Sequence, residues 1–129
     1  MSAATVAAIV DRIKAQGLRC TTERPSSTAY PYVVVYADSA PRSSDREADV
    51  RVTRTLGWQT TVVGESAEQC RAALDRVTDA LGDWRPSLPG RVFHKVEHLS
   101  SQPVRRDEDL PDRTVFIATD QWRVVSDPV

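Results

Sequence analysis

The clearest pattern of hydrophobic and polar positions lies in residues 56–81. Trp58, Thr60 and Val62 alternate with the residues between them in a run rich in β-branched and aromatic side chains. This period of two predicts a β-strand with one buried face. Gly64 interrupts the run, so we expect the strand to end there.

A helix is predicted directly after this strand. Ser66 and Gln69 have the spacing of a capping box, in which both side chains bind backbone N–H groups at the start of a helix. Gly82 is placed to end the helix in a left-handed conformation. Between these limits, apolar side chains recur at spacings of three and four and form one stripe, which consists of Cys70, Ala73, Leu74, Val77 and Leu81.

Shorter patterns predict the remaining elements. Residues 5–16 have apolar side chains at helical spacing, and Gly17 follows as a candidate C-cap. The run YVVVY at residues 32–36 predicts a strand in the middle of the sheet. Further strands are expected at residues 18–23, 91–99 and 114–125, and residues 50–58 are expected to form a long strand or a hairpin arm. Core positions outside the stripe are Val6, Ile9, Val10, Ile13, Val33 and Val35.

Two long connections, residues 37–48 and 100–112, contain Pro, Ser and mixed charges without apolar periodicity. The order α-β-β-β-α-β-β predicts an α+β fold in which both helices cover one face of a mostly antiparallel sheet. A strict β-α-β alternation is absent, and neither a G-x-G-x-x-G nor a P-loop motif occurs, which argues against a nucleotide-binding fold. The length of 129 residues favours a single domain over residues 1–129.

Composition excludes several classes of protein. The chain has 17 basic and 18 acidic residues and a formal charge of −1, so it lacks the overall positive field of a nucleic-acid-binding protein. No apolar run approaches the ~20 residues that cross a bilayer, so we expect a soluble protein made in the cytoplasm, with no membrane partner. Cys20 and Cys70 are expected to be buried free thiols rather than a disulfide.

Two candidate sites, a catalytic serine and a pair of zinc ligands, do not meet the structural requirements of their chemistry. Ser66 lies in a stretch similar to a nucleophile elbow, but Glu68 occupies the position that requires Gly. His94 and His98 are predicted on one strand, where four residues span about 13 Å, too far for two ligands of one zinc ion.

A third candidate, a calcium loop, fails on missing residues. Asp45, Glu47 and Asp49 alternate like calcium ligands, but Val50 and Leu56 stand where such a loop requires Gly and Glu. We therefore expect no enzymatic activity, no metal ion and no cofactor.

Arginine residues interleaved with acidic residues lie in or near both long connections. Arg pairs with carboxylates and with phosphates alike. The pattern itself leaves three interpretations open, namely a solvated surface, contacts between subunits, and direct contact with DNA. The arginines concerned are Arg42, Arg46, Arg51, Arg54, Arg105 and Arg106.

Four stretches, taken in order, resemble one known family. They are YPYVVVYADSAPRSSDREADVR, WQTTVVGESAEQCRAALDRVTDAL, PGR and SQPVRRDEDLPDRTVFIATDQWRV, and they span residues 30–125. Their order and spacing resemble the tail terminator proteins, also called minor tail or tail completion proteins, of long-tailed phages that infect actinobacteria.

The resemblance implies a structural virion protein of the tail and head-tail junction, without catalytic residues or cofactors. It implies a ring, usually a hexamer, that caps the tail tube, stops its polymerisation and joins it to the head connector while double-stranded DNA passes through. The implied partners are the protein itself, the tail tube protein and the head-tail connector protein. In such a ring we place Arg46, Asp49, Arg105, Arg106 and Asp107 at the subunit interface, and Arg42 and Arg54 facing the lumen.

The sequence leaves two other functions open. A neck or head completion protein would contact the portal side of the neck rather than the tail tube. A small-molecule binding module of the host, or a degenerate enzyme, would need a concave apolar pocket with convergent polar groups.

Overall fold

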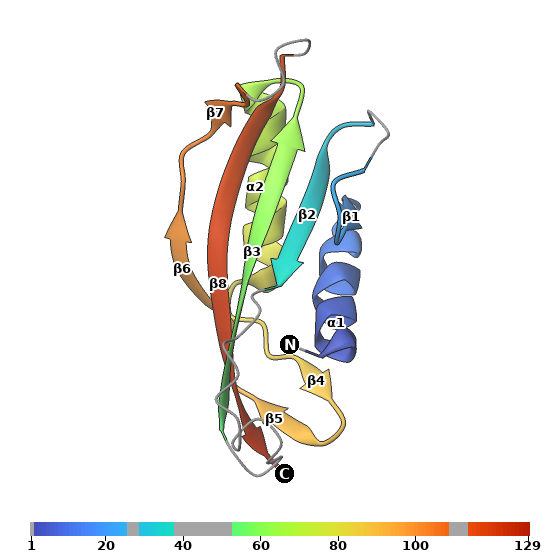
Figure 1. The fold of residues 1–129 in the computed structure, drawn as a ribbon, viewed down its shortest axis with the longest axis vertical. Helices are drawn as coiled ribbons and strands as arrows, with labels where there is room; N and C mark the ends of the chain where they lie inside the picture. The colour runs from blue at the N-terminus through green and yellow to red at the C-terminus, as the bar shows by residue number, and fades with distance from the viewer. Residues whose placement is uncertain (1, 26–28, 38–52, 109–113) are drawn as a thin grey trace.

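A computed structural model of the chain describes residues 2–25, 29–37, 53–108 and 114–129. It contains two helices, α1 (Ala3–Lys14) and α2 (Ala67–Leu81), and a sheet of eight strands (Figure 1). The α+β class predicted from the sequence is confirmed. The strands are β1 (Arg19–Thr21), β2 (Tyr32–Ala37), β3 (Arg54–Gly64), β4 (Ser87–Leu88), β5 (Arg91–Phe93), β6 (Glu97–Ser101), β7 (Arg105–Arg106) and β8 (Phe116–Pro128).

The long strands β3 and β8 form the centre of the sheet. The strand order is β1-β2-β3-β8-β5-β4, and β6 and β7 also pair with β8. One edge of β8 pairs with β3 along its length, and the other edge pairs in turn with β7, β6 and β5. Among the strands that the structure describes, only β1 and β2 pair in parallel. The strand predicted mid-sheet, β2, is the second in the order.

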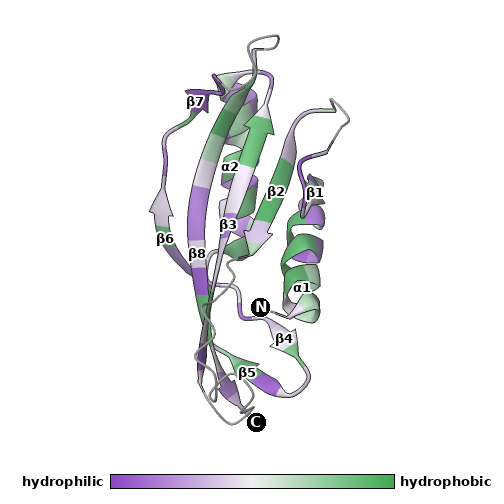
Figure 2. Ribbon diagram, in the orientation of Figure 1, coloured by the Kyte–Doolittle hydropathy of each residue, from purple (hydrophilic) through white to green (hydrophobic). Residues whose placement is uncertain are grey.

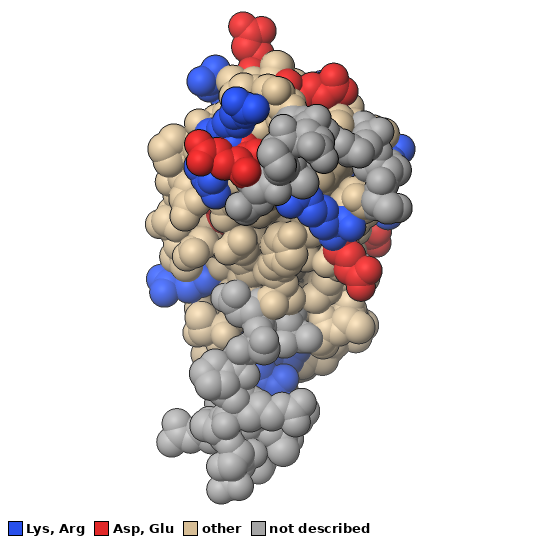
Figure 3. All heavy atoms as spheres, turned by 45° about the horizontal axis from the view of Figure 1, so that its top comes forward, with Lys and Arg blue, Asp and Glu red and all other residues tan. Residues whose placement is uncertain are grey.

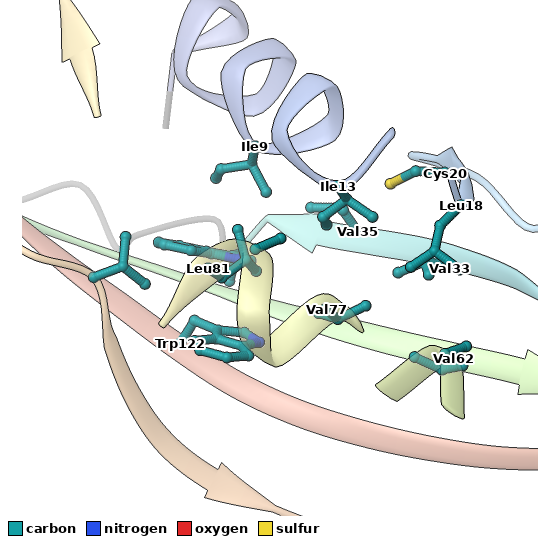
Figure 4. Packing of buried hydrophobic residues seen from close by; sticks show 14 of the residues in the cluster. Ile9, Ile13, Leu18, Cys20, Val33, Val35, Val62, Val77, Leu81 and Trp122 are labelled. Atoms are coloured by element: carbon teal, nitrogen blue, oxygen red, sulfur yellow. The ribbon is translucent and has the colours of Figure 1, made fainter. Parts of the chain in front are cut away.

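Both helices pack on one face of the sheet. In Figure 1, α2 crosses behind β3 and β8, and α1 lies beside it, next to β1 and β2. Alternate residues of β3, including Trp58 and Val62, point toward the helices, as the period of two predicted. Figure 4 shows Ile9 and Ile13 of α1 meeting Leu81 of α2 and the strands below. Of the predicted core residues, Val6, Val10 and Leu74 are only half-buried.

The opposite face carries a smaller cluster at one end. Tyr32, Val34, Val63 and Val115 are buried there, which explains why β2 is apolar on both faces. Figure 2 also shows that the apolar residues gather at one end, because β8 changes from hydrophobic near its start to hydrophilic in its middle.

The capping box at the start of α2 is confirmed with one change. The Ser66 hydroxyl accepts from the Gln69 N–H, and the Gln69 side chain accepts from the N–H of Glu65 rather than from that of Ser66. The predicted end of α2 is wrong in detail. Gly82 is extended at φ −61°, and the left-handed residue is Asp83, at φ 59°.

Gly64 has a packing role beyond ending β3. A Cβ atom at this position would lie 2.9 Å from the backbone nitrogen of Cys70, so only Gly allows the first turn of α2 to come this close. Cys70 and Cys20 are free and buried, as expected. Burial raises the pKa of each thiol to about 11.

The second half of the chain contains more strands than its patterns indicated. The strand expected at residues 91–99 is two strands, β5 and β6. The strand is interrupted because the N–H of Val96 donates to the carbonyl of Trp84 rather than to β8. The connection expected at residues 100–112 includes the last two residues of β6 and all of β7. The predicted loop at 37–48 lies outside the described residues, apart from Ala37, which ends β2.

Candidate functional site

The short strand β7 carries two of the arginines expected at a subunit interface. Arg105 and Arg106 are exposed, and they lie opposite Ile117 and Phe116, where β8 begins. Figure 3 shows basic and acidic side chains gathered around this end of the molecule. An exposed guanidinium in this position presents a planar set of N–H donors that suits a carboxylate on another protein.

Asp107 is placed differently from the expectation. Its side chain is 3% exposed, and a carboxylate oxygen lies 2.8 Å from a guanidinium nitrogen of Arg24 in the same chain. This hydrogen bond raises the pKa of Arg24 above its ordinary value. We therefore correct the prediction that Asp107 faces a neighbouring subunit, because its carboxylate is buried and bound within the chain.

The ion pair of Arg24 and Asp107 borders a small cavity on the face of the sheet opposite α1 and α2. The cavity measures about 80 Å³, and its apolar lining comes from Val34, Val63 and Ile117. Sites for small organic ligands usually measure ~300 to 1,000 Å³. This cavity therefore does not favour the small-molecule binding module.

The middle of the same face is polar but uncharged. Gln59 and Thr61 of β3 lie opposite Gln121 and Thr119 of β8. The hydroxyl oxygens of Thr61 and Thr119 are 3.2 Å apart. This part of the sheet has no group that would carry out acid-base or nucleophilic chemistry at neutral pH.

Three polar side chains meet at the far end of β8. Asp127 accepts a hydrogen bond from the Thr53 hydroxyl at 2.6 Å, and its other oxygen lies 2.6 Å from His94 Nε2. The bond to His94 is the main cause that lowers the pKa of Asp127. This end of the sheet also holds Arg54, which is half-buried and pairs in register with Ser126. Arg54 thus lies near other polar groups of its own chain.

His98, the second histidine of the rejected metal pair, has different neighbours. Its Nε2 lies 3.5 Å from an oxygen of Asp120, and its ring stacks on Trp122. The structure therefore gives His94 and His98 separate carboxylate partners. In the described part of the chain, no three His, Cys, Asp or Glu side chains are grouped as metal ligands.

Sequence reasoning missed this cluster around Asp120, although one signal was present. Ala118, Asp120, Trp122 and Val124 occupy alternate positions of β8 and are all buried. An acidic residue in the middle of an apolar alternation indicates a buried carboxylate that needs a partner.

Three of the predicted site residues cannot be placed. Arg42, Arg46 and Asp49 lie outside the described residues, as do the acidic residues considered for calcium. None of the helices that the structure describes is long and apolar enough to cross a membrane.

The structure is that of a small α+β protein with exposed arginines at the β7 end of its sheet. Its sequence matches the family described as "Tail completion protein gp17" over residues 1–119, and the chain belongs to that family. It is therefore a structural protein of the phage virion tail.

A solved structure supports the same fold. One chain of a "Virion of native gene transfer agent (GTA) particle" is 19% identical, with 94% of this chain and 92% of that chain covered and a TM-score of 0.69. A comparison with curated protein sequences gave no match.

Proposed function

We propose that the protein forms a homo-hexameric ring that caps the completed tail tube, ends tube polymerisation and joins the tail to the head connector. Membership of the tail completion family over residues 1–119 is the observation that supports this function most directly. The mechanism is steric, since a closed ring on the last tube layer leaves no surface to which another tube subunit could add. This mechanism requires no catalysis, and we propose that the protein has none.

The proposed ring uses head-to-tail contacts, in which a patch on one subunit meets a different patch on the next. Arg105 and Arg106 are our candidates for one of these patches, because β7 exposes both at one end of the sheet. Interleaved charges of both signs set the register of such a contact. Arg46 and Asp49 remain candidates by sequence alone.

The proposed lumen admits double-stranded DNA without holding it tightly. The formal charge of −1 supports weak retention, because tight DNA binding requires many basic contacts to phosphate. Arg42 and Arg54 are our candidates for the lumen. Of these two, Arg54 is described, and its half-buried position leaves part of the side chain accessible.

Replacement of Arg106 by Glu tests the ring contact. An exposed charge contributes little to stability, so the Arg106→Glu monomer should fold normally but should fail to close the ring. Electron microscopy of tails assembled with this variant should show abnormally long tubes without heads. Arg76→Glu is the matched control, since Arg76 is exposed on α2 and undergoes the same charge change.

Two outcomes would change the proposal. Tubes of normal, uniform length with attached heads in the Arg106→Glu case would remove β7 from the closing interface. Copurification with a portal-side connector but not with the tail tube protein would replace the tail terminator by a neck or head completion protein.

A further inference from the structure

Asp120 is a buried acidic residue on β8. Its side chain is 1% exposed, and neither carboxylate oxygen has a hydrogen-bond partner among the described residues. It lies on β8 and faces the helices, opposite Thr60 of β3 and Ser101 of β6. A buried carboxylate is unfavourable unless a positive or hydrogen-bonding group compensates it.

His98 supplies the nearest positive group. Its Nε2 lies 3.5 Å from Asp120 Oδ2. The imidazole ring stacks on the indole of Trp122, with centroids 4.3 Å apart and planes at 19°. The Trp122 N–H in turn donates to the Thr60 hydroxyl at 2.9 Å, which fixes the indole. The histidine is thus held beside Asp120 by an aromatic surface that also stabilises a cation.

Other charged groups near this pair are directed elsewhere. Glu97 and Arg123 pair with each other at 2.7 Å, and alternation along β8 places them on the opposite face of the sheet. Along β8, Arg106 is opposite Phe116, about 13 Å from Asp120, and Arg91 is opposite Pro128, about 26 Å away on the other side. Lys95, which precedes β6, is exposed.

The helix and strand that cover Asp120 bring no charge toward it. The α2 side chains buried against the sheet are apolar except for the Cys70 thiol, and the acidic and basic residues of α2 are exposed. On β3, the residue opposite Asp120 is the uncharged Thr60. His98 is therefore the group whose proton decides whether the buried carboxylate is compensated.

We infer that His98 and Asp120 form an ion pair whose protonation state controls whether β6 stays paired with β8. We call this ion pair the clasp. When the imidazole carries its second proton, the pair is neutral overall and β6 is held in place. When that proton leaves, Asp120 is a buried carboxylate without a counter-charge, and the free energy falls if β6 opens and water reaches the carboxylate. The five residues of β6 are all exposed, so the main interactions that oppose this opening are the stacking of His98 on Trp122 and the backbone pairing with β8.

The clasp also bears on assembly, in a way that rests on the proposed function. The chain runs from β6 directly to β7, which carries Arg105 and Arg106. A loosened β6 would leave the proposed ring contact without a fixed position. Ring closure would then be favoured at acidic pH, where an imidazole carries its second proton.

Amide hydrogen exchange of the full chain tests the clasp without reference to any ring. Protection factors for β6, corrected for intrinsic exchange, are measured at about pH 5 and at about pH 8, a range that spans imidazole protonation. We expect wild-type protection to fall by about tenfold or more at the higher pH, since a buried charge loses its partner. Glu97→Gln is the matched control, because it breaks an exposed pair between the same two strands and should change protection less than about fivefold.

Two variants separate the charge from the packing. His98→Phe keeps an aromatic ring on Trp122 but cannot be protonated, so β6 should exchange rapidly at both pH values. Asp120→Asn removes the buried charge, so β6 should stay protected at both. Equal wild-type protection at the two pH values, or an unchanged pH dependence in Asp120→Asn, would overturn the clasp. Size measurements of the assembled ring report separately on the proposed function, so either idea can fail alone.

Discussion

The stripe on α2 offers a quantitative test of how the helix packs, because two of its leucines differ in burial. Leu81 is 0% exposed and belongs to the core cluster, whereas Leu74 is half-buried at its margin. Leu81→Ala should cost about 3 to 4 kcal/mol, from lost burial and from the cavity left under the sheet. Leu74→Ala should cost about 1 kcal/mol, because part of its apolar surface is already in water and no closed cavity forms.

Urea unfolding followed by tryptophan fluorescence measures both losses, since Trp58 and Trp122 are buried and report on the same core. The midpoint should move in proportion to the free-energy loss while the slope stays constant. In thermal unfolding, the two variants should lose about 12 °C and about 4 °C. Equal losses, or a larger loss for Leu74→Ala, would show that α2 is rotated relative to the packing described above.

The remaining predictions concern Gly64, Gly17 and the two cysteine thiols. Gly64→Ala should destabilise the chain by about 1 to 3 kcal/mol through overpacking, since the new methyl group would meet the Cys70 backbone nitrogen at 2.9 Å. Gly17→Ala, whose site is open but left-handed at φ +81°, should cost only about 1 kcal/mol in an unfolding titration. Because burial raises the pKa of Cys20 and Cys70 from 9.0 to about 11, both thiols should resist alkylation at neutral pH in the folded chain. Their contribution to stability should be complete below pH 9.0 and should be lost as the pH rises through about 11, and rapid alkylation of the native protein would contradict this.

Local periodicity was sufficient for the elements whose own side chains determine them. The alternation at Trp58, Thr60 and Val62 and the capping residues Ser66 and Gln69 predicted β3 and α2 within a few residues. Both signals are short-range, since strand alternation and helix capping involve neighbours in the sequence. The same holds for α1.

Long-range pairing accounts for what the sequence did not reveal. The strands β6 and β7 are short and polar, and they are strands only because β8 is long enough to pair with each of them. Asp107 lies in a charged stretch that is locally typical of a loop, and its burial depends on Arg24, 83 positions earlier in the chain. The partner of Asp120 likewise comes from another strand, so the sequence could indicate a buried acid but not His98.

The position of β8 in the chain has a kinetic consequence. Its partners β3, β5, β6 and β7 all precede it, so during synthesis they emerge before the strand that joins them. Until residues 116–128 are available, the eleven residues of β3 have an unpaired edge, and β6 and β7 have no sheet to join. Such an edge accepts strands from other molecules. Concentrated nascent chains should therefore be most prone to mispairing just before β8 is added, and correct folding of the subunit depends on rapid docking of this strand.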